Sequence, residues 1–84
     1  MSVLHAADIV VVWMHDGKPA RLIWGGTRYR VSDEPTRLSD LLFEVTHPPM
    51  IDGWRFQGTD EGGRSKVFDV RRTVAGWELV RVYD

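Results

Sequence analysis

The stretch Ile23-Trp24-Gly25-Gly26-Thr27-Arg28-Tyr29-Arg30-Val31 predicts a tight β-hairpin from which the rest of the chain can be laid out. Two β-prone runs flank Gly25-Gly26, and a two-residue hairpin loop needs the positive φ that glycine adopts without a Cβ clash. Opposed residues of an antiparallel pair share one face of the sheet. The face expected to be apolar carries Ala20, Leu22, Trp24, Thr27, Tyr29 and Val31.

The same register predicts a cluster of positive charge on the other face of this hairpin. It sets Arg21 directly opposite Arg30, with Arg28 beside them. Like charges in opposed positions are destabilising, so we expect an anion close to them. The anion is either a carboxylate on a neighbouring strand or loop, or an external group such as phosphate.

The residues before this hairpin predict a further strand, over Asp8 to Met14, that ends in a second tight turn. The strand is rich in β-branched and aromatic residues, and Asp16-Gly17 is a typical two-residue loop. A regular turn would pair this strand with the apolar face of the hairpin and bury Ile9, Val11 and Trp13 opposite Trp24, Leu22 and Ala20.

Residues 8–31 are therefore expected to form a three-stranded meander with two partly apolar faces. Its second face would carry the arginines together with Val10, Val12, Met14 and Ile23. So much exposed apolar surface calls for a covering element or a partner subunit.

The middle of the chain predicts one short helix, from about Pro35 to Glu44. Polar residues and Pro35 resemble a helix entry, and apolar residues follow at i, i+3, i+4 and i+7, namely Leu38, Leu41, Leu42 and Val45. A strand through Leu41 to Thr46 is the alternative. The segment His47-Pro48-Pro49 ends any regular element, because a residue that precedes proline avoids the helical conformation.

Three more strands are expected, over residues 54–57, 66–72 and 77–83. A three-residue loop, Val74 to Gly76, places Gly76 where left-handed φ is needed. It pairs Val70 with Val80, Phe68 with Val82 and Asp69 with Arg81, and it leaves Trp77, Leu79 and Tyr83 on the second face.

Together these elements indicate a single small domain over residues 1–84, with residues 1–7 expected to be disordered. The expected fold class is mainly β (α+β). We expect a six-stranded antiparallel, strongly bent sheet or an SH3-like barrel with one short inserted helix.

Composition narrows the setting of the protein. The chain has no cysteine, which excludes disulfides and thiolate metal sites. Its apolar run from Ile9 to Met14 is too short for a signal or membrane segment, so we expect a cytoplasmic protein without a membrane partner. The net charge of −1 argues against a protein that coats nucleic acid.

No catalytic or metal-binding pattern stands out, so we expect neither an enzyme nor a bound cofactor. The histidines, His5, His15 and His47, lack metal-ligand spacing. The segment Gly62-Gly63-Arg64-Ser65-Lys66 resembles a phosphate cradle, but a strand rather than a helix is expected to follow it. No serine has the context of a nucleophile.

The most suggestive set of residues combines arginines with aromatic side chains on the second face. Such a combination can hold single-stranded nucleic acid by base stacking and phosphate contacts. Alternatively, the arginine stems cover apolar sheet and their heads meet the acidic residues of the 32–62 segment. The candidate binding residues are Arg21, Arg28, Arg30, Arg71, Arg81, Trp77 and Tyr83.

The chain also resembles a small actinobacterial domain family of unknown function. The resemblance rests on Trp24-Gly25-Gly26-Thr27-Arg28-Tyr29-Arg30-Val31, Trp54-Arg55, Val67-Phe68-Asp69-Val70 and the ending Trp77 to Asp84, which contains Arg81-Val82-Tyr83-Asp84. Domains of that family occur alone or beside Y-family translesion polymerases, which implies an accessory role in DNA repair. The chain departs from the family in its middle, where the family has a Trp-rich strand. The family supplies no catalytic residue.

The function predicted from the sequence is that of a non-enzymatic binding or adaptor module. Its partner would be another protein or a second copy of the chain, as in a homodimer. A single-stranded nucleic-acid-binding domain is the alternative.

Overall fold

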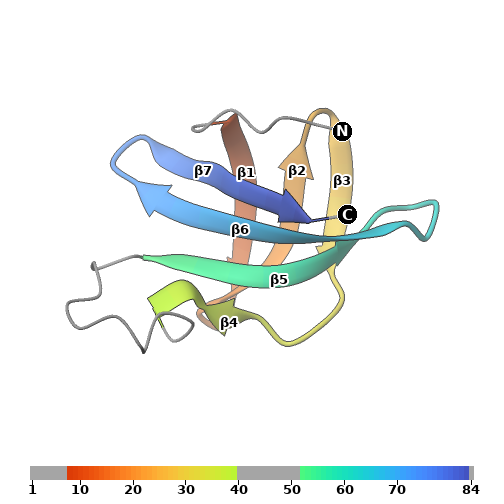
Figure 1. Cartoon of the computed structure of the whole chain (residues 1–84), viewed down its shortest axis with the longest axis horizontal. Helices are drawn as coiled ribbons and strands as arrows, with labels where there is room; N and C mark the ends of the chain where they lie inside the picture. Colours follow the sequence, from red (N-terminus) through yellow and green to blue (C-terminus); the bar gives the residue numbers. More distant parts are fainter. Residues whose placement is uncertain (1–7, 40–51, 84) are drawn as a thin grey trace.

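The computed structural model describes residues 8–39 and 52–83, and these consist almost entirely of β-strands (Figure 1). The strands are β1 (Asp8–His15), β2 (Lys18–Trp24), β3 (Thr27–Val31), β4 (Thr36–Arg37), β5 (Gly53–Thr59), β6 (Ser65–Thr73) and β7 (Gly76–Tyr83). Their order in the sheet is β3-β2-β1-β7-β6-β5-β4, and β3 also pairs with β5. This last pairing closes a six-stranded antiparallel barrel with β4 as an extra strand, which confirms the predicted fold class.

The barrel has two walls whose strands cross at a steep angle. Strands β5, β6 and β7 run across β1, β2 and β3 (Figure 1). The core lies between the walls and contains Val10, Leu22, Tyr29, Trp54, Phe56, Phe68, Val70 and Leu79.

The hairpin of β2 and β3 has the predicted register. Gly25 and Gly26 have φ values of 59° and 79°, the left-handed pair that a type I′ turn requires. Leu22 pairs with Tyr29, and both side chains are buried. Arg21 pairs with Arg30, as the sequence predicts.

The hairpin of β1 and β2 has the predicted turn, but the predicted pairing is wrong. Met14 pairs with Pro19 and Trp13 pairs with Arg21, so Ala20 is an extra residue that forms a β-bulge. Proline has no N–H to donate to the ladder and occurs in sheets mainly at edges, strand starts and bulges. Pro19 therefore accounts for the position of the irregularity.

The bulge exchanges the inner and outer residues of β1. Val10 is 4% exposed and belongs to the core, against which Val12 also packs. Ile9, Val11 and Trp13, which a regular turn would bury, are 80%, 49% and 47% exposed. The expected burial of these three residues is therefore wrong, as is the expected outward position of Val10 and Val12.

The ring of Phe68 occupies the centre of the core. It meets Tyr29 edge-on, with ring centroids 4.8 Å apart, and lies 6.0 Å from the ring centroids of both Trp24 and Phe56. A Cβ on Gly58 would lie 2.9 Å from Cε2 of Phe68 and 3.0 Å from Cβ of Tyr29. The barrel can therefore close tightly here only because residue 58 has no side chain.

Polar contacts extend the closure of the barrel beyond the end of β3. The N–H of Ser32 donates to the carbonyl oxygen of Gln57 at 2.8 Å. The N–H of Gln57 donates to Oδ1 of Asp33, also at 2.8 Å. A carboxylate thus replaces a strand carbonyl where β3 ends, and the edge of β5 stays satisfied up to β4.

The β6–β7 hairpin departs from the predicted three-residue loop. Thr73 pairs with Gly76, which leaves a two-residue loop, and a second irregularity follows at Val80. The predicted pairs of Phe68 with Val82 and of Asp69 with Arg81 are confirmed. The predicted pair of Val70 with Val80 is wrong, because Val70 pairs with Leu79.

The helix predicted from Pro35 does not begin there. Thr36 and Arg37 form β4, and Leu38 and Ser39, the last residues described before residue 52, lie in a 3₁₀ turn. Pairing with β5 competes successfully with helix formation, because the guanidinium of Arg37 stacks 4.6 Å from the centroid of the Trp54 ring. The remainder of that helix and the alternative strand at residues 41–46 lie outside the described residues, as do residues 1–7.

Candidate binding surface

The outer surface of β1, β2 and β3 combines apolar side chains with arginines. Two rows cross the three strands: Trp13, Arg21 and Arg30 form one row, and Val11, Ile23 and Arg28 form the other. We call this surface, with Ile9 added at the end of β1, the amphipathic wall. Its residues are Ile9, Val11, Trp13, Arg21, Ile23, Arg28 and Arg30.

The amphipathic wall changes from apolar to cationic across its width. Strand β1 contributes only apolar side chains, β2 contributes Arg21 and Ile23, and β3 contributes Arg28 and Arg30. Neighbouring strands are about 4.8 Å apart, so the apolar edge lies roughly 10 Å from the cationic edge. A ligand that fits this wall is anionic along one side and apolar along the other.

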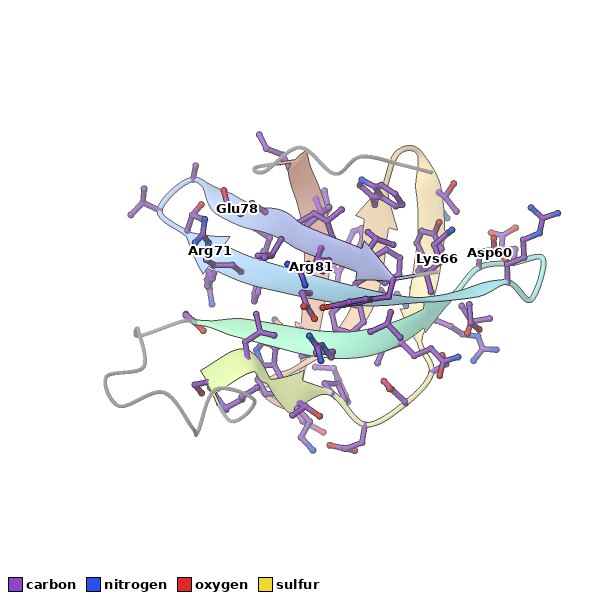
Figure 2. All side chains as sticks on the ribbon, in the orientation of Figure 1. Asp60, Lys66, Arg71, Glu78 and Arg81 are labelled. Carbon is purple, nitrogen blue, oxygen red and sulfur yellow. The ribbon has the colours of Figure 1, made fainter. Side chains whose placement is uncertain are left out.

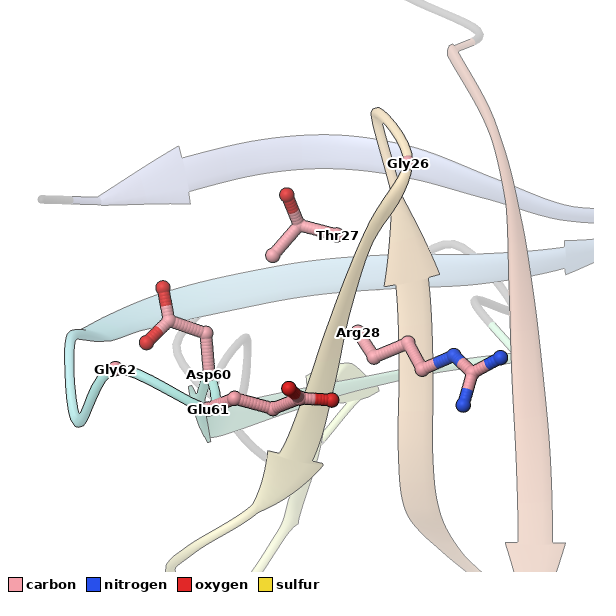
Figure 3. A pocket seen from close by; sticks show the side chains of 6 residues that line it. All are labelled: Gly26, Thr27, Arg28, Asp60, Glu61 and Gly62. Carbon is pink, nitrogen blue, oxygen red and sulfur yellow. The ribbon is translucent and has the colours of Figure 1, made fainter.

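The three arginines of the wall have no carboxylate partner among the described residues. No hydrogen bond or ion pair within residues 8–39 and 52–83 involves their side chains. Arg28 extends over β2, away from the carboxylates of Asp60 and Glu61 in the β5–β6 loop (Figure 3). Of the two anions that the sequence leaves open, the carboxylates of Asp60 and Glu61 line a hollow together with Arg21 and Arg30 but form no ion pair with them.

Two shallow hollows mark the wall. One, of about 320 Å³, is lined by Trp13, Arg21, Leu22, Ile23, Arg28 and Tyr29. The other, of about 270 Å³, is lined by Arg21, Arg28, Tyr29, Arg30, Thr59, Asp60 and Glu61. They share Arg21, Arg28 and Tyr29 and therefore adjoin. Together they run from Trp13 across the arginines to the β5–β6 loop.

The opposite wall holds a polar network that is satisfied internally. Asp69 is only 6% exposed although it faces outward. Arg55 donates to both of its carboxylate oxygens, from Nε to Oδ1 at 2.7 Å and from Nη2 to Oδ2 at 2.9 Å. Nη2 of Arg55 also donates to the hydroxyl of Tyr83, which in turn donates to Asp69. These bonds to Asp69 raise the pKa of the Arg55 guanidinium above its ordinary value.

The remaining charges of this wall are also paired or stacked. Arg71 forms an ion pair with Glu78 on the neighbouring strand (Figure 2). Arg81 lies over the ring of Tyr83, with its guanidinium carbon 5.8 Å from the centroid, and donates a long hydrogen bond to the hydroxyl. Both carboxylates of this wall, Asp69 and Glu78, are thus paired, while Arg72 and Arg81 lie over the rings of Trp77 and Tyr83.

The structure divides the binding residues predicted from the sequence into three groups. Arg21, Arg28 and Arg30 lie together on the amphipathic wall, whereas Arg71, Arg81 and Tyr83 lie on the opposite wall. Trp77 packs against the core. The single surface that would join all seven is therefore not formed.

Sequence reasoning missed two residues of these surfaces. It assigned Trp13 to the core, although Pro19 was a signal for the bulge that turns Trp13 outward. It gave Arg55 no role, although a strand register that pairs Arg55 with Asp69 would have revealed one.

The described residues hold neither grouped metal-ligand side chains nor a helix able to span a membrane. Within residues 8–39 and 52–83, no three histidine, aspartate or glutamate side chains are grouped as metal ligands would be. The same residues contain no helix with the length and apolar character needed to span a bilayer.

Comparison of the chain with protein-family models, with curated proteins and with solved structures finds no match.

Proposed function

We propose that this chain is a non-enzymatic binding module that holds an anionic, partly apolar partner on the amphipathic wall. The observation that carries the proposal is the contact between two unusual features of one surface. None of the described residues forms an ion pair with Arg21, Arg28 or Arg30. These arginines adjoin the exposed apolar side chains of β1, namely Ile9, Val11 and Trp13.

Both features are costly unless a partner uses them. Opposed arginines repel each other, so Arg21 and Arg30 destabilise the hairpin until an anion lies between them. Contiguous exposed apolar side chains mark interaction surfaces in soluble proteins. Tryptophan and arginine are also the residues that most often dominate binding energy at interfaces.

The other wall is a weaker candidate for the working surface. Its two carboxylates, Asp69 and Glu78, already bind Arg55 and Arg71. Its other two arginines, Arg72 and Arg81, lie over aromatic rings. A partner would have to break these contacts before it gained from their charges, and breaking the part-buried pair of Arg55 with Asp69 is costly.

A second copy of the chain fits the amphipathic wall poorly. A two-fold interface brings the same surface of both copies together. Arg21, Arg28 and Arg30 of each copy would then be buried with no carboxylate on the wall to receive them, which costs several kcal/mol. We therefore favour a different molecule as the partner over a homodimer.

We propose in addition that the barrel is SH3-like and serves as an adaptor in the cytoplasm, near DNA repair, as the sequence resemblance to domains that occur beside translesion polymerases implies. Both belong to the proposal, because folds of this kind host many functions.

The test is a titration of the ¹⁵N-labelled full chain, followed by amide shifts in NMR spectra. Two probes are added separately at low ionic strength: a thymidine oligonucleotide of about 12 nucleotides, and a synthetic peptide rich in glutamate with one aromatic residue. The proposal expects at least one probe to shift amides of the amphipathic wall, such as those of Trp13, Ile23 and Arg28.

Amides of the opposite wall serve as the internal control. Those of Arg55, Asp69 and Tyr83 should move little, because their side chains already have partners. If both probes leave the amphipathic wall unshifted, the proposed function is wrong.

A further inference from the structure

We infer that the partner held on the amphipathic wall is a single strand of nucleic acid, with one base stacked on Trp13 and phosphates bound by Arg21, Arg28 and Arg30. This inference rests on the proposed function, because it names the partner of the same surface.

Trp13 has the position of a stacking platform. Its indole is 47% exposed and makes no ring contact with another aromatic residue among those described. Trp13 lines the first hollow together with Ile23 and Arg28. A base can therefore lie against the indole while its sugar contacts the aliphatic side chain of Ile23. Such stacking accepts any base, because every base has a π-face.

The arginines lie where the backbone of that strand would run. Arg21 is directly opposite Trp13 on the neighbouring strand, and Arg30 is one strand further. Arg28 follows on the same edge, about 7 Å from Arg30 along β3. Arginine matches the geometry of phosphate with two parallel hydrogen bonds. The gradient across the wall thus follows the two sides of a nucleotide chain, bases on one side and phosphates on the other.

The shape of the wall favours a single strand over a duplex. The wall is the side of a closed barrel, and the described residues place no helix or projecting ribbon on it that could enter a groove. In a duplex the stacking faces of the bases are hidden, and Trp13 would meet only the backbone. The net charge of −1 also gives the chain little general attraction to duplex DNA.

The closure of the barrel argues against an acidic peptide as the partner. Extended peptides commonly bind a sheet by adding a strand to a free edge, where main-chain hydrogen bonds supply the affinity. On the cationic side of the wall, β2 pairs with both β1 and β3, and β3 pairs with β5 through Arg30 and Val31, which leaves only the short stretch from Thr27 to Tyr29 unpaired on that side. A peptide on this face would lack those bonds, whereas a nucleotide strand does not need them.

The β5–β6 loop limits how far a bound nucleotide chain can extend across the arginines. Asp60 and Glu61 line the second hollow together with the arginines, and their carboxylates repel phosphates. The bound nucleic-acid strand is therefore expected to occupy the hollow nearer Trp13. Removing the charge of Glu61, an exposed residue, should tighten binding.

The experiment measures fluorescence anisotropy of a labelled thymidine oligonucleotide of about 12 nucleotides as the full chain is added. Three phosphate contacts predict that affinity falls on the order of tenfold between about 50 and about 200 mM salt. Trp13→Ala should weaken binding roughly tenfold, whereas Trp13→Phe should restore most of the affinity because it keeps a stacking ring. Glu61→Gln should strengthen binding.

Arginine variants test the phosphate contacts against a matched control. Arg21→Gln and Arg30→Gln should each weaken binding and reduce the salt slope by about 0.7. Arg37→Gln removes the same charge from β4, off the wall, and should change neither. Circular dichroism confirms that each variant is folded.

The outcomes separate the inference from the function on which it rests. Equal affinity for a duplex, or unchanged binding by Trp13→Ala, overturns the stacking inference. If the glutamate-rich peptide shifts the amphipathic wall and the oligonucleotide does not, the inference is wrong and the proposed function stands. If neither probe shifts the wall, both are wrong.

Discussion

Trp13 lies directly opposite Arg21 on the outer surface of the barrel, one residue away from the pairing that a regular Asp16-Gly17 hairpin would impose. The extra residue, Ala20, produces this shift, and the neighbouring Pro19, which has no N–H to donate to the ladder, accounts for its location. One inserted residue therefore decides which of the five consecutive apolar residues from Ile9 to Trp13 form the core and which meet the solvent.

Substitution of two neighbouring valines tests this assignment. We expect Val10→Ala to lower the free energy of unfolding by about 2 kcal/mol, because it removes two buried methyl groups and leaves a cavity. Val11→Ala should change it by less than about 0.5 kcal/mol, since Val11 is half exposed. Urea unfolding followed by tryptophan fluorescence measures both. A larger loss for Val11→Ala than for Val10→Ala would support the regular register and contradict the bulge.

Gly58 should tolerate no side chain. We expect Gly58→Ala to destabilise the protein by about 1–3 kcal/mol, because its methyl group would press against Phe68 and the Cβ of Tyr29. Gly62→Ala is the matched control: its nearest neighbour would be Oδ1 of Asp60 at 3.4 Å, and no positive φ is required there. Thermal unfolding of both variants gives the comparison. Equal melting temperatures would show that the Phe68 ring is not fixed against residue 58.

The buried carboxylate of Asp69 should matter more than that of Glu78, whose partner Arg71 is half exposed. We expect Asp69→Asn to cost about 2 kcal/mol, because the Arg55 guanidinium loses its charged partner in a part-buried site. Glu78→Gln removes the partner of Arg71 and should cost less than about 1 kcal/mol, since the Arg71 side chain is half exposed. Denaturant unfolding at neutral pH compares the two. Equal losses would mean that burial of Asp69 adds nothing to its pair.

The tight turn at Gly25-Gly26 gives a further test of backbone conformation. Gly26 has a φ of 79°, so we expect Gly26→Ala to cost about 1–2 kcal/mol. Gly26→Asn should cost less, because asparagine adopts the left-handed region more readily than alanine. Chemical unfolding distinguishes them, and a neutral Gly26→Ala would contradict the type I′ geometry.

Most of the strand layout could be predicted from the sequence, because it depends on local signals. The glycine turn fixed the β2–β3 register correctly down to the pair of Arg21 with Arg30. The two bulges, by contrast, could not be predicted from the alternation of apolar and polar residues. A bulge changes register within an already apolar strand, and the pattern of Ile9 to Trp13 fits either face equally well. Pro19 signalled the first bulge, but nothing around Val80 signalled the second.

The candidate site was predicted in part, for reasons that follow from the same bulges. The arginines of β2 and β3 were placed together correctly, because their faces follow from one regular hairpin. Their aromatic neighbour was assigned wrongly: the expected Trp77 packs against the core, and Trp13 takes the outer position. The network of Arg55, Asp69 and Tyr83 joins three strands, so no single hairpin could reveal it.

The pairing of β1 with β7 has a consequence for how the chain reaches its native state. Val10 pairs with Trp77, so residues from the two ends of the described chain must find each other before the barrel is complete. Such long-range contacts slow folding, because a large loop must close before they form. During synthesis, the hairpins can assemble as they leave the ribosome, but the ring stays open until β7 has emerged. Until then the apolar side chains of β1 are exposed on both faces, and the nascent chain is at its most prone to aggregate.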